Sequence, residues 1–393
     1  MRLMPALIVT VALGLTGAAN AAPTGAPIGA DVLFWGQTKR EAGFPHMEAH
    51  FPVRTIKRGE RVHSLPAGVP LTVTIPGKDG VQTLDAFMAE QKTAGVLVIQ
   101  DGHIRLERYA LGYGKEGRWT SFSVAKSFTS TLVGAAVRDG YIKSLDDPVT
   151  RYIKGLAGSA YDGVSVRQLL TMTSGVKWNE DYADPKSDVA QLFTVVPDPG
   201  VDANVSYMRK LPREAAPGTK WRYKTGETNL IGVLVTQATG KSLSDYLSEK
   251  IWQPYGMEQD GIWMIDALGH EPGGCCLSAS LRDYGRFGQF IMDGAVANGR
   301  KVLPDGWLEA ATVKQADIGR PGAGYGFQWW TEDKGPFNAE GIFGQAIHID
   351  PKRRLIVVVS SAWPAADPPE RWRALGRLFE GVAAAADEDR KAP

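Results

Sequence analysis

The sequence predicts a mixed fold of the α/β (α+β) class, in which one sheet is built from both ends of the chain and a helical subdomain is inserted between them. Runs of β-branched and other apolar residues occur at residues 96–99 and again at 355–360, whereas helical periodicity dominates between residues 123 and 257. Strands this distant in sequence can share one layer when the helices between them fold to one side. A cleft between two such parts is a natural ligand site.

Composition narrows the class of protein. The chain has 393 residues, of which 44% are hydrophobic and 22% charged, as in an ordinary globular protein. Lys and Arg number 44 against 43 for Asp and Glu, a formal net charge of +1. Nucleic-acid binding normally requires a basic excess, so no nucleic-acid partner is expected.

The amino terminus has the layout of a secretory signal peptide. Arg2 precedes an apolar run over residues 3–15, and small residues, Ala19 and Ala21, follow at the −3 and −1 positions of a cleavable bond. The run is too short for a membrane span, which needs about 20 apolar residues. We therefore expect residues 1–21 to be removed, no stable membrane insertion afterwards, and a periplasmic or secreted protein.

The remaining chain divides into three parts. Residues 22–80 are rich in Pro and Gly and are expected to form an extension wrapped on the surface. Residues 81–130 and 258–393 should form the sheet subdomain, and residues 131–257 the helical subdomain. The periodicities predict helices at 84–92, 123–138, 166–172, 228–238, 243–251 and 370–384, a hairpin at 96–111, and strands at 324–330, 342–349 and 355–360.

The sequence contains no recognisable motif for binding a metal ion or a cofactor. Among six histidines only His46 and His50 lie four residues apart, and no phosphate loop is present, so we expect no metal and no cofactor. Cys275 and Cys276 are adjacent, which excludes a Cys-x-x-Cys motif. They could form a vicinal disulfide, but two small buried apolar residues are the favoured interpretation.

The tetrapeptide Ser-x-x-Lys occurs twice, as Ser123–Lys126 and as Ser174–Lys177. On a helix, residues three apart share a face, so the lysine amine can reach the serine hydroxyl. The first copy opens an apolar-periodic helix, whose positive end leaves the Ser123 N–H able to bind a developing oxyanion. The second copy contains Gly175 and follows an apolar helix, so it is expected to be a helix stop.

The first copy therefore predicts a nucleophile. Ser123 would attack a carbonyl, and Lys126 would accept its proton if burial lowers the lysine pKa from its usual value of about 10.4. Tyr223, in a loop before a helix, is the candidate for moving the proton to the leaving group. The glycine-rich segment at residues 339–345 should let a substrate approach the backbone, with the Ile342 N–H as second oxyanion donor.

Together these motifs resemble the serine β-lactamase and penicillin-binding-protein superfamily, and within it most closely the class C-like esterases and 6-aminohexanoate-dimer hydrolases. The segments that carry the resemblance are residues 121–127, 145–149, 166–175, 217–223, 239–247, 254–257, 282–288 and 325–330. The resemblance implies a β-lactamase/transpeptidase-like fold, with a central antiparallel sheet flanked by helices. It also implies an acyl-enzyme on Ser123, with Lys126, Tyr223 and the Ile342 N–H in their family roles.

The same resemblance suggests residues that contact substrate. Thr225, Gly341 and Gln345 occupy matching motif positions. Tyr182 resembles a tyrosine that contacts the substrate amide in the dimer hydrolases, although it could equally be an aromatic residue of a surface loop.

Two departures from the family pattern bear on the substrate. The family's Tyr-x-Asn is Tyr223-Lys224-Thr225, and the cationic Lys-Thr-Gly triplet is Ala339-Glu340-Gly341. Glu340 would repel the carboxylate of penicillins and D-alanyl peptides, which favours neutral or cationic substrates. We therefore expect an exported serine hydrolase of small-molecule esters or amides. A β-lactamase or D-alanyl-D-alanine peptidase, and a catalytically silent binding module of the same fold, remain the alternatives.

Overall fold

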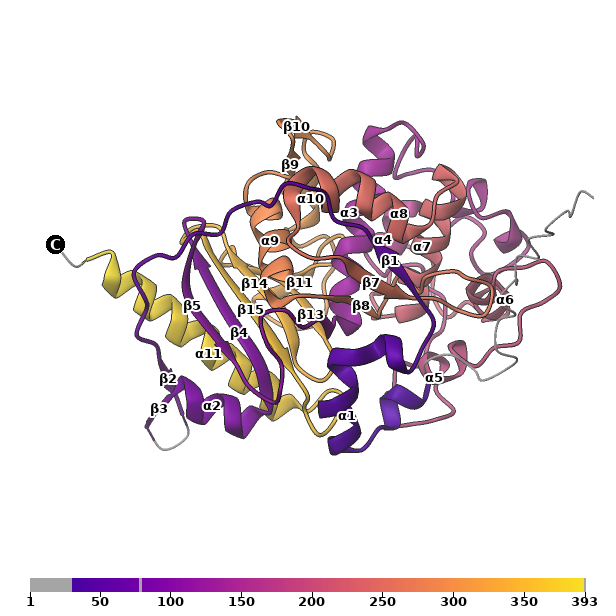
Figure 1. Cartoon of the computed structure of the whole chain (residues 1–393). Coiled ribbons are helices and arrows are strands. Elements are labelled where there is room, and N and C mark those ends of the chain that lie inside the picture. Colours follow the sequence, from indigo (N-terminus) through magenta and orange to yellow (C-terminus); the bar gives the residue numbers. More distant parts are fainter. Residues whose placement is uncertain (1–29, 78–79, 392–393) are drawn as a thin grey trace, which may run out of the picture.

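The computed structural model describes residues 30–77 and 80–391, so the predicted signal peptide lies outside the described residues. The main sheet has seven strands in the order β11-β12-β13-β14-β15-β4-β5, and every neighbouring pair is antiparallel. In Figure 1 the purple strands β4 and β5 lie beside the yellow and orange strands of the carboxyl third. The expected union of distant segments is confirmed by the register of β15 on β4, where Val357 pairs with Val98.

The strand bounds show where the sequence pattern was misleading. The strands are β4 (Thr93–Gln100), β5 (His103–Tyr109), β11 (Ala323–Tyr325), β12 (Trp330–Glu332), β13 (Phe337–Gly341), β14 (Gln345–Asp350) and β15 (Leu355–Ser361). The single strand expected at 324–330 is two strands, because Gln328 takes a positive φ of 62° in the turn between them. The strand expected at 342–349 begins only at Gln345, because Phe343 and Gly344 turn the chain with positive φ.

Helices cover both faces of this sheet. On one face α9 (Leu281–Met292) packs closely, with Gly285 against Leu97 and Gly288 against Ile347. The neighbouring His348 points to the other face and stacks on Phe379 of α11 (Pro369–Asp389), with ring centroids 4.3 Å apart. Side chains alternate across a strand, so α9 and α11 lie on opposite faces. The amino-terminal α2 (Leu84–Gln91) lies beside β3 (Val81–Thr83).

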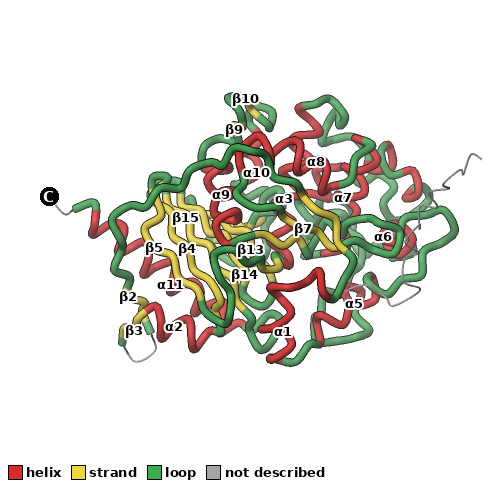
Figure 2. Tube along the Cα trace, viewed as in Figure 1, coloured by secondary structure: helices red, strands yellow, loops and turns green. Residues whose placement is uncertain are grey.

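The middle of the chain forms the helical part, which Figure 2 shows as a mainly red and green region beside the yellow sheet. Its central helix α3 (Ala125–Arg138) packs against α7 (Thr225–Thr239). Around them lie α4 (Val166–Leu170), α5 (Asp188–Leu192), α6 (Ala203–Met208), α8 (Leu243–Leu247) and a π-helix (Ser248–Gly256). From the carboxyl third of the chain, α10 (Trp307–Ala311) brings Trp307 against Gly134 of α3. Helix α7 begins three residues before its predicted start, and the helix expected at 243–251 continues to Gly256 in π form.

A second sheet of four strands, in the order β1-β7-β8-β6, lies between these two parts (Figures 1 and 2). Its strands are β1 (Val53–Ile56), β6 (Trp119–Thr120), β7 (Gly261–Met264) and β8 (Leu277–Ala279). Two small hairpins complete the strands, β2 (Thr74–Pro76) with β3 and β9 (Val296–Ala297) with β10 (Arg300–Lys301). In the described part of the chain, every helix is too short or too polar to cross a membrane.

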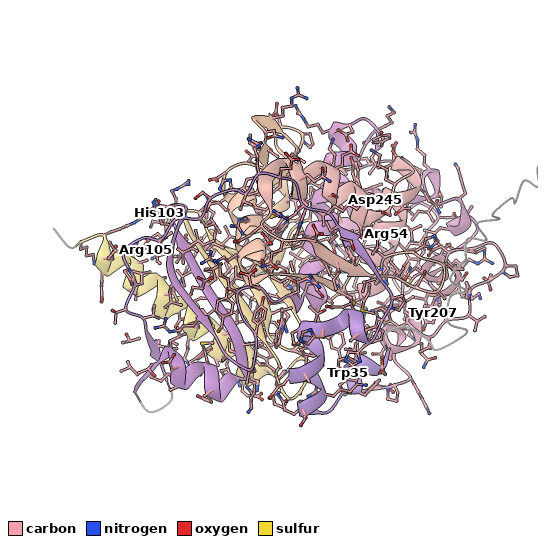
Figure 3. All side chains as sticks on the ribbon, in the orientation of Figure 1. Trp35, Arg54, His103, Arg105, Tyr207 and Asp245 are labelled. Carbon is pink, nitrogen blue, oxygen red and sulfur yellow. A yellow bond between two sulfur atoms is a disulfide. The ribbon has the colours of Figure 1, made fainter. Side chains whose placement is uncertain are left out.

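The amino-terminal extension also contributes side chains to the core, which the expectation of a surface wrap did not include. Trp35, which Figure 3 labels beside α1 (Gln37–Gly43), is buried, as are Phe44 and Met47. The Phe44 ring lies 5.0 Å from that of Phe122 and 5.4 Å from that of Phe343. These apolar side chains are interspersed among polar residues without periodicity, so the pattern hid their burial.

The structure also corrects the favoured interpretation of the cysteines. Cys275 and Cys276 are joined in a vicinal disulfide, and both are buried. They follow a turn at Gly273 and Gly274, and Cys276 takes a positive φ of 73°. That local backbone geometry is not visible in the sequence.

Candidate active site

The first Ser-x-x-Lys copy forms a buried hydrogen-bonded pair. Ser123 lies in the 3-10 turn Phe122–Val124 that leads into α3, and Lys126 lies one turn further on. The Lys126 Nζ donates to Ser123 Oγ at 3.0 Å, to Thr225 Oγ1 at 3.0 Å and to the Gly274 carbonyl at 2.8 Å. Lys126 is only 2% exposed and Ser123 8% exposed. The three oxygen acceptors hold the amine against the serine hydroxyl.

Burial changes the acid–base character of Lys126. Removal from water disfavours the ammonium form and lowers the lysine pKa to about 7, while the Glu180 carboxylate partly opposes the shift. A substantial fraction of the amine is therefore neutral near pH 7 and able to accept a proton. From the sequence, the role of Lys126 as a base was conditional on a lowered pKa. The burial that lowers it is a property of the folded chain.

Tyr223 faces the same pair from the segment that precedes α7. Its ring centroid lies 5.1 Å from Lys126 Nζ, and the ring stacks on Trp330 at 5.4 Å. Burial, and next the Glu180 carboxylate, raise the pKa of Tyr223 well above its usual value, while a hydrogen bond with Ser123 opposes the rise. Tyr223 is thus a phenol at neutral pH, suited to give a proton rather than to take one from Ser123.

The end of β13 approaches the Ser123 backbone closely. A Cβ at Gly341 would lie 2.6 Å from the Ser121 carbonyl oxygen and 3.1 Å from the Ser123 nitrogen, so only glycine fits. Ile342 follows directly and lines the same cavity as Ser123. Phe122, the residue before Ser123, has a positive φ of 41°, an uncommon conformation for an aromatic residue.

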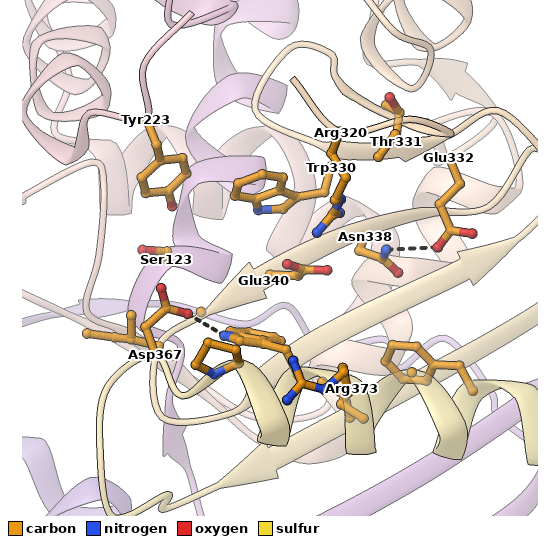
Figure 4. A pocket seen from close by; sticks show the side chains of 18 of the residues that line it. Ser123, Tyr223, Arg320, Trp330, Thr331, Glu332, Asn338, Glu340, Asp367 and Arg373 are labelled. Atoms are coloured by element: carbon orange, nitrogen blue, oxygen red, sulfur yellow. Dashed lines mark hydrogen bonds between the residues drawn. The ribbon is translucent and has the colours of Figure 1, made fainter. Parts of the chain in front are cut away.

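A cavity of about 800 Å³ opens on Ser123 and runs between the edge strands β11–β13 and α11 (Figure 4). Ser123, Tyr223, Gly341 and Ile342 lie at its inner end, and Tyr182 also lines it. Trp330 and Trp372 supply apolar walls. Five of the residues expected at the site, including Ser123, therefore line one cavity.

Glu180 is the residue that the sequence analysis missed. Its carboxylate accepts from the Thr225 backbone N–H at 2.9 Å, from the Tyr182 hydroxyl at 2.8 Å, and from the Thr225 hydroxyl and the Trp178 indole. A hydrogen-bonded chain thus runs from Glu180 through Thr225 to Lys126. An isolated glutamate in a loop carries no motif, so no pattern in the sequence could single it out.

Two residues expected to bind substrate are directed elsewhere. Thr225 is 3% exposed and contacts Lys126 and Glu180 rather than the cavity. The Gln345 amide is buried and is bonded to the Ser361 backbone through both its nitrogen, at 2.8 Å, and its oxygen, at 3.1 Å. The Gln345 side chain therefore joins β14 to β15. Gln345 lies near the cavity only through its backbone, which pairs with Gly341 at the turn between β13 and β14.

The second Ser-x-x-Lys copy lies in the turn that follows α4 and not on a helix, as the sequence predicts, although α4 already ends at Leu170. Gly175 takes a positive φ of 76°, and Lys177 is exposed. The buried Ser174 hydroxyl donates to Glu227 and lies 3.3 Å from Lys224 Nζ. Ser174 and Lys177 therefore belong to different environments and form no pair.

One cluster of possible metal ligands was not anticipated. Potential ligand atoms of Asp202, Asp266 and His270 all lie within 4.8 Å of one another. A hydrogen bond of 2.7 Å between His270 and Asp202 accounts for part of this proximity. None of the three lines the Ser123 cavity.

Comparison with known proteins agrees with this geometry. A sequence model of the Beta-lactamase family matches residues 81–378. The 6-aminohexanoate-dimer hydrolase of Paenarthrobacter ureafaciens is 30% identical over 309 residues, which cover 74% of this chain and 78% of that enzyme. Esterase EstB of Burkholderia gladioli is 30% identical over 147 residues, which cover 36% of this chain and 33% of the esterase.

The fold has solved counterparts as well. A Bacillus anthracis structure provisionally assigned as a 6-aminohexanoate-dimer hydrolase matches with a TM-score of 0.80 and 24% identity, over 90% of this chain and 95% of that one. The chain has the β-lactamase and penicillin-binding-protein fold, and it belongs to the beta-lactamase family. It is a serine hydrolase of that family, with a 6-aminohexanoate-dimer hydrolase among its relatives.

Proposed function

We propose that this protein hydrolyses small-molecule esters or amides through an acyl-enzyme on Ser123. The neutral Lys126 amine takes the Ser123 proton as the oxygen attacks the substrate carbonyl. The Ser123 and Ile342 N–H groups stabilise the resulting oxyanion. As the intermediate collapses, Tyr223 gives its proton to the leaving oxygen or nitrogen and regains one from the Lys126 ammonium. Water then repeats the sequence on the acyl-enzyme, releasing the acid and restoring Ser123.

The observation that carries this proposal is the 3.0 Å contact between Lys126 Nζ and Ser123 Oγ in a buried site. Burial leaves the Lys126 amine partly neutral at pH 7. A base that can accept a proton therefore already lies within hydrogen-bond reach of the nucleophile. Tyr182 lines the cavity, and because its hydroxyl proton is donated to Glu180, its oxygen is left to accept from the N–H of an amide substrate. A linear amide of the 6-aminohexanoate type, the substrate named for the Paenarthrobacter relative, is the first amide to test.

The experiment is replacement of Ser123 by Ala in the purified protein. We expect Ser123→Ala to abolish turnover of p-nitrophenyl esters and to remove the mass increase that an acylating ester produces on the wild-type chain. Ser174→Ala is the matched control and should keep both. Full activity of Ser123→Ala would contradict the proposal, and an unmodified Ser123 in folded wild-type protein would identify a silent binding module. Efficient turnover of nitrocefin would instead favour a β-lactamase.

Export forms a separate part of the proposal. We propose that residues 1–21 direct the chain out of the cytoplasm and that the mature enzyme acts in the periplasm or outside the cell. Amino-terminal sequencing of protein from the exported fraction should begin after Ala21. Recovery of the full-length chain from the cytoplasm alone would contradict it.

A further inference from the structure

The charged side chains that line the Ser123 cavity are arranged by sign and depth. Glu180 and Glu340 are half-buried on its inner wall, whereas Arg320 and Arg373 are exposed at its mouth. Glu332 is exposed at the mouth as well, whereas Asp367 is exposed beside Ser123 (Figure 4). A substrate that reaches Ser123 therefore meets acidic groups once it has left the solvent.

Glu340 occupies the position from which a side chain can face a bound substrate. It lies on β13 directly before Gly341, the residue that touches the Ser123 backbone. Figure 4 shows its carboxylate in the space between Ser123 and Asn338. Asn338 is two residues earlier on the same face, about 7 Å along the strand. The groove thus extends past Glu340 for the length of a short chain.

Among the described residues, the Glu340 carboxylate has no neutralising partner of its own. In the part of the chain that the structure describes, no hydrogen bond contributes to its ionisation, and its pKa is raised to about 7 by burial. Arg320 opposes this shift, but Asp367 and Glu332 add repulsion. Glu180 differs, because four donors from Thr225, Tyr182 and Trp178 already occupy it.

The surroundings favour an organic cation as the missing partner. Trp330 and Trp372 line the same cavity, and Asp367 lies near its inner end, where one carboxylate oxygen accepts from the Trp372 indole. A carboxylate flanked by aromatic rings stabilises alkylammonium groups, both by charge and by cation–π attraction. A substrate carboxylate at the same place would meet repulsion from Glu340 and Asp367.

We propose that Glu340, assisted by Asp367, forms a subsite for a positively charged amine, so that the enzyme prefers esters or amides that carry an ammonium group. The inference rests on the proposed hydrolysis at Ser123 and specifies its substrate class. Glu340 is then a specificity-determining residue, and the arginines at the mouth contact solvent or a more distant part of the substrate.

Two pairs of isosteric esters test the proposal at pH 8, where Glu340 is ionised. On the acyl side, p-nitrophenyl 6-aminohexanoate is compared with p-nitrophenyl heptanoate, in which a methyl group replaces the ammonium. On the leaving-group side, acetylcholine is compared with its neutral tert-butyl isostere. A charge-assisted contact should raise kcat/KM for the cationic ester in at least one pair by about ten- to a hundredfold.

Substitution assigns that preference to Glu340. Glu340→Gln should reduce the ratio of the two kcat/KM values toward one, and Glu340→Asp should retain part of it. Glu370→Gln is the matched control, because Glu370 is an exposed carboxylate of α11 that does not line the cavity. It removes the same charge and should leave the ratio unchanged.

The outcomes separate the subsite from the chemistry. Hydrolysis of cationic and neutral esters at equal rates, or a wild-type preference that Glu340→Gln retains, would overturn the subsite while Ser123 acylation stands. A preference for p-nitrophenyl hydrogen adipate would overturn it in favour of Arg320 and Arg373. Failure to cleave any of these esters, with Ser123 unmodified, would overturn both the subsite and the proposed function.

Discussion

The two Ser-x-x-Lys copies have the same residue types at the same spacing but different structures. In the first, Ser123 and Lys126 lie on one helical face, and the amine is buried within 3.0 Å of the hydroxyl. In the second, Gly175 turns the chain, so that Ser174 is buried and Lys177 is exposed. The tetrapeptide therefore has chemical meaning only where the backbone is helical and the lysine is excluded from water.

The partners of the two serines reinforce this difference. Ser123 meets an amine that burial makes partly neutral, whereas Ser174 joins an ion pair between Lys224 and Glu227, both fully buried. Burial raises the Glu227 pKa, while Lys224 and Ser174 oppose that rise. The first serine thus has a proton acceptor, and the second stabilises a buried carboxylate. The first copy therefore has the arrangement that the proposed reaction needs, and the second has that of a buried ion pair.

The largest contrast is expected between the two lysines. Lys126→Ala removes the proposed base and should lower kcat/KM for a p-nitrophenyl ester by about a hundredfold to ten-thousandfold, because general-base catalysis contributes that much. Lys177→Ala changes an exposed side chain and should leave the rate unaltered. Steady-state kinetics on both variants, with circular dichroism to verify folding, measures the difference. Equal losses in the two variants would remove the distinction between the copies.

The pH dependence sharpens the same comparison. Reaction requires the neutral amine, so kcat/KM for a neutral ester should rise with pH through about 7 as Lys126 loses its proton. Glu180→Gln should move this rising limb of the pH–rate profile to lower pH, because the Glu180 carboxylate raises the pKa of Lys126. Glu340 also titrates near pH 7, and Glu340→Gln is the control that should keep the limb. A limb that follows Glu340 instead would contradict the role of Lys126.

The smallest expected effect concerns the stability of the second copy. Ser174→Ala deprives buried Glu227 of a donor and should reduce the free energy of unfolding by about 1–3 kcal/mol. Its activity per folded molecule should remain at the wild-type level. Urea denaturation gives the free energy of unfolding, and ester turnover below the transition gives the activity. A stable but inactive Ser174→Ala protein would show that the second serine takes part in catalysis.

Sequence reasoning succeeded where local rules are sufficient. The apolar periodicity after Ser123 identified α3, and the β-branched runs identified β4 and β15. It was less successful where distant segments decide conformation. Positive φ at Gln328 and Phe343 ended strands that the pattern would continue, and Phe44 entered the core from a segment without periodicity.

The candidate site divides in the same way. The sequence alone determined which groups could react, since Ser123, Lys126 and Tyr223 are chemically suited to acyl transfer and the helix fixes the first two on one face. Only the tertiary structure decided the partners, because Thr225 and Gly274 accept from Lys126 out of separate segments, and Glu180, from a third, accepts from Thr225. Proton affinity depends on burial and on nearby charge, and both are properties of the packed chain.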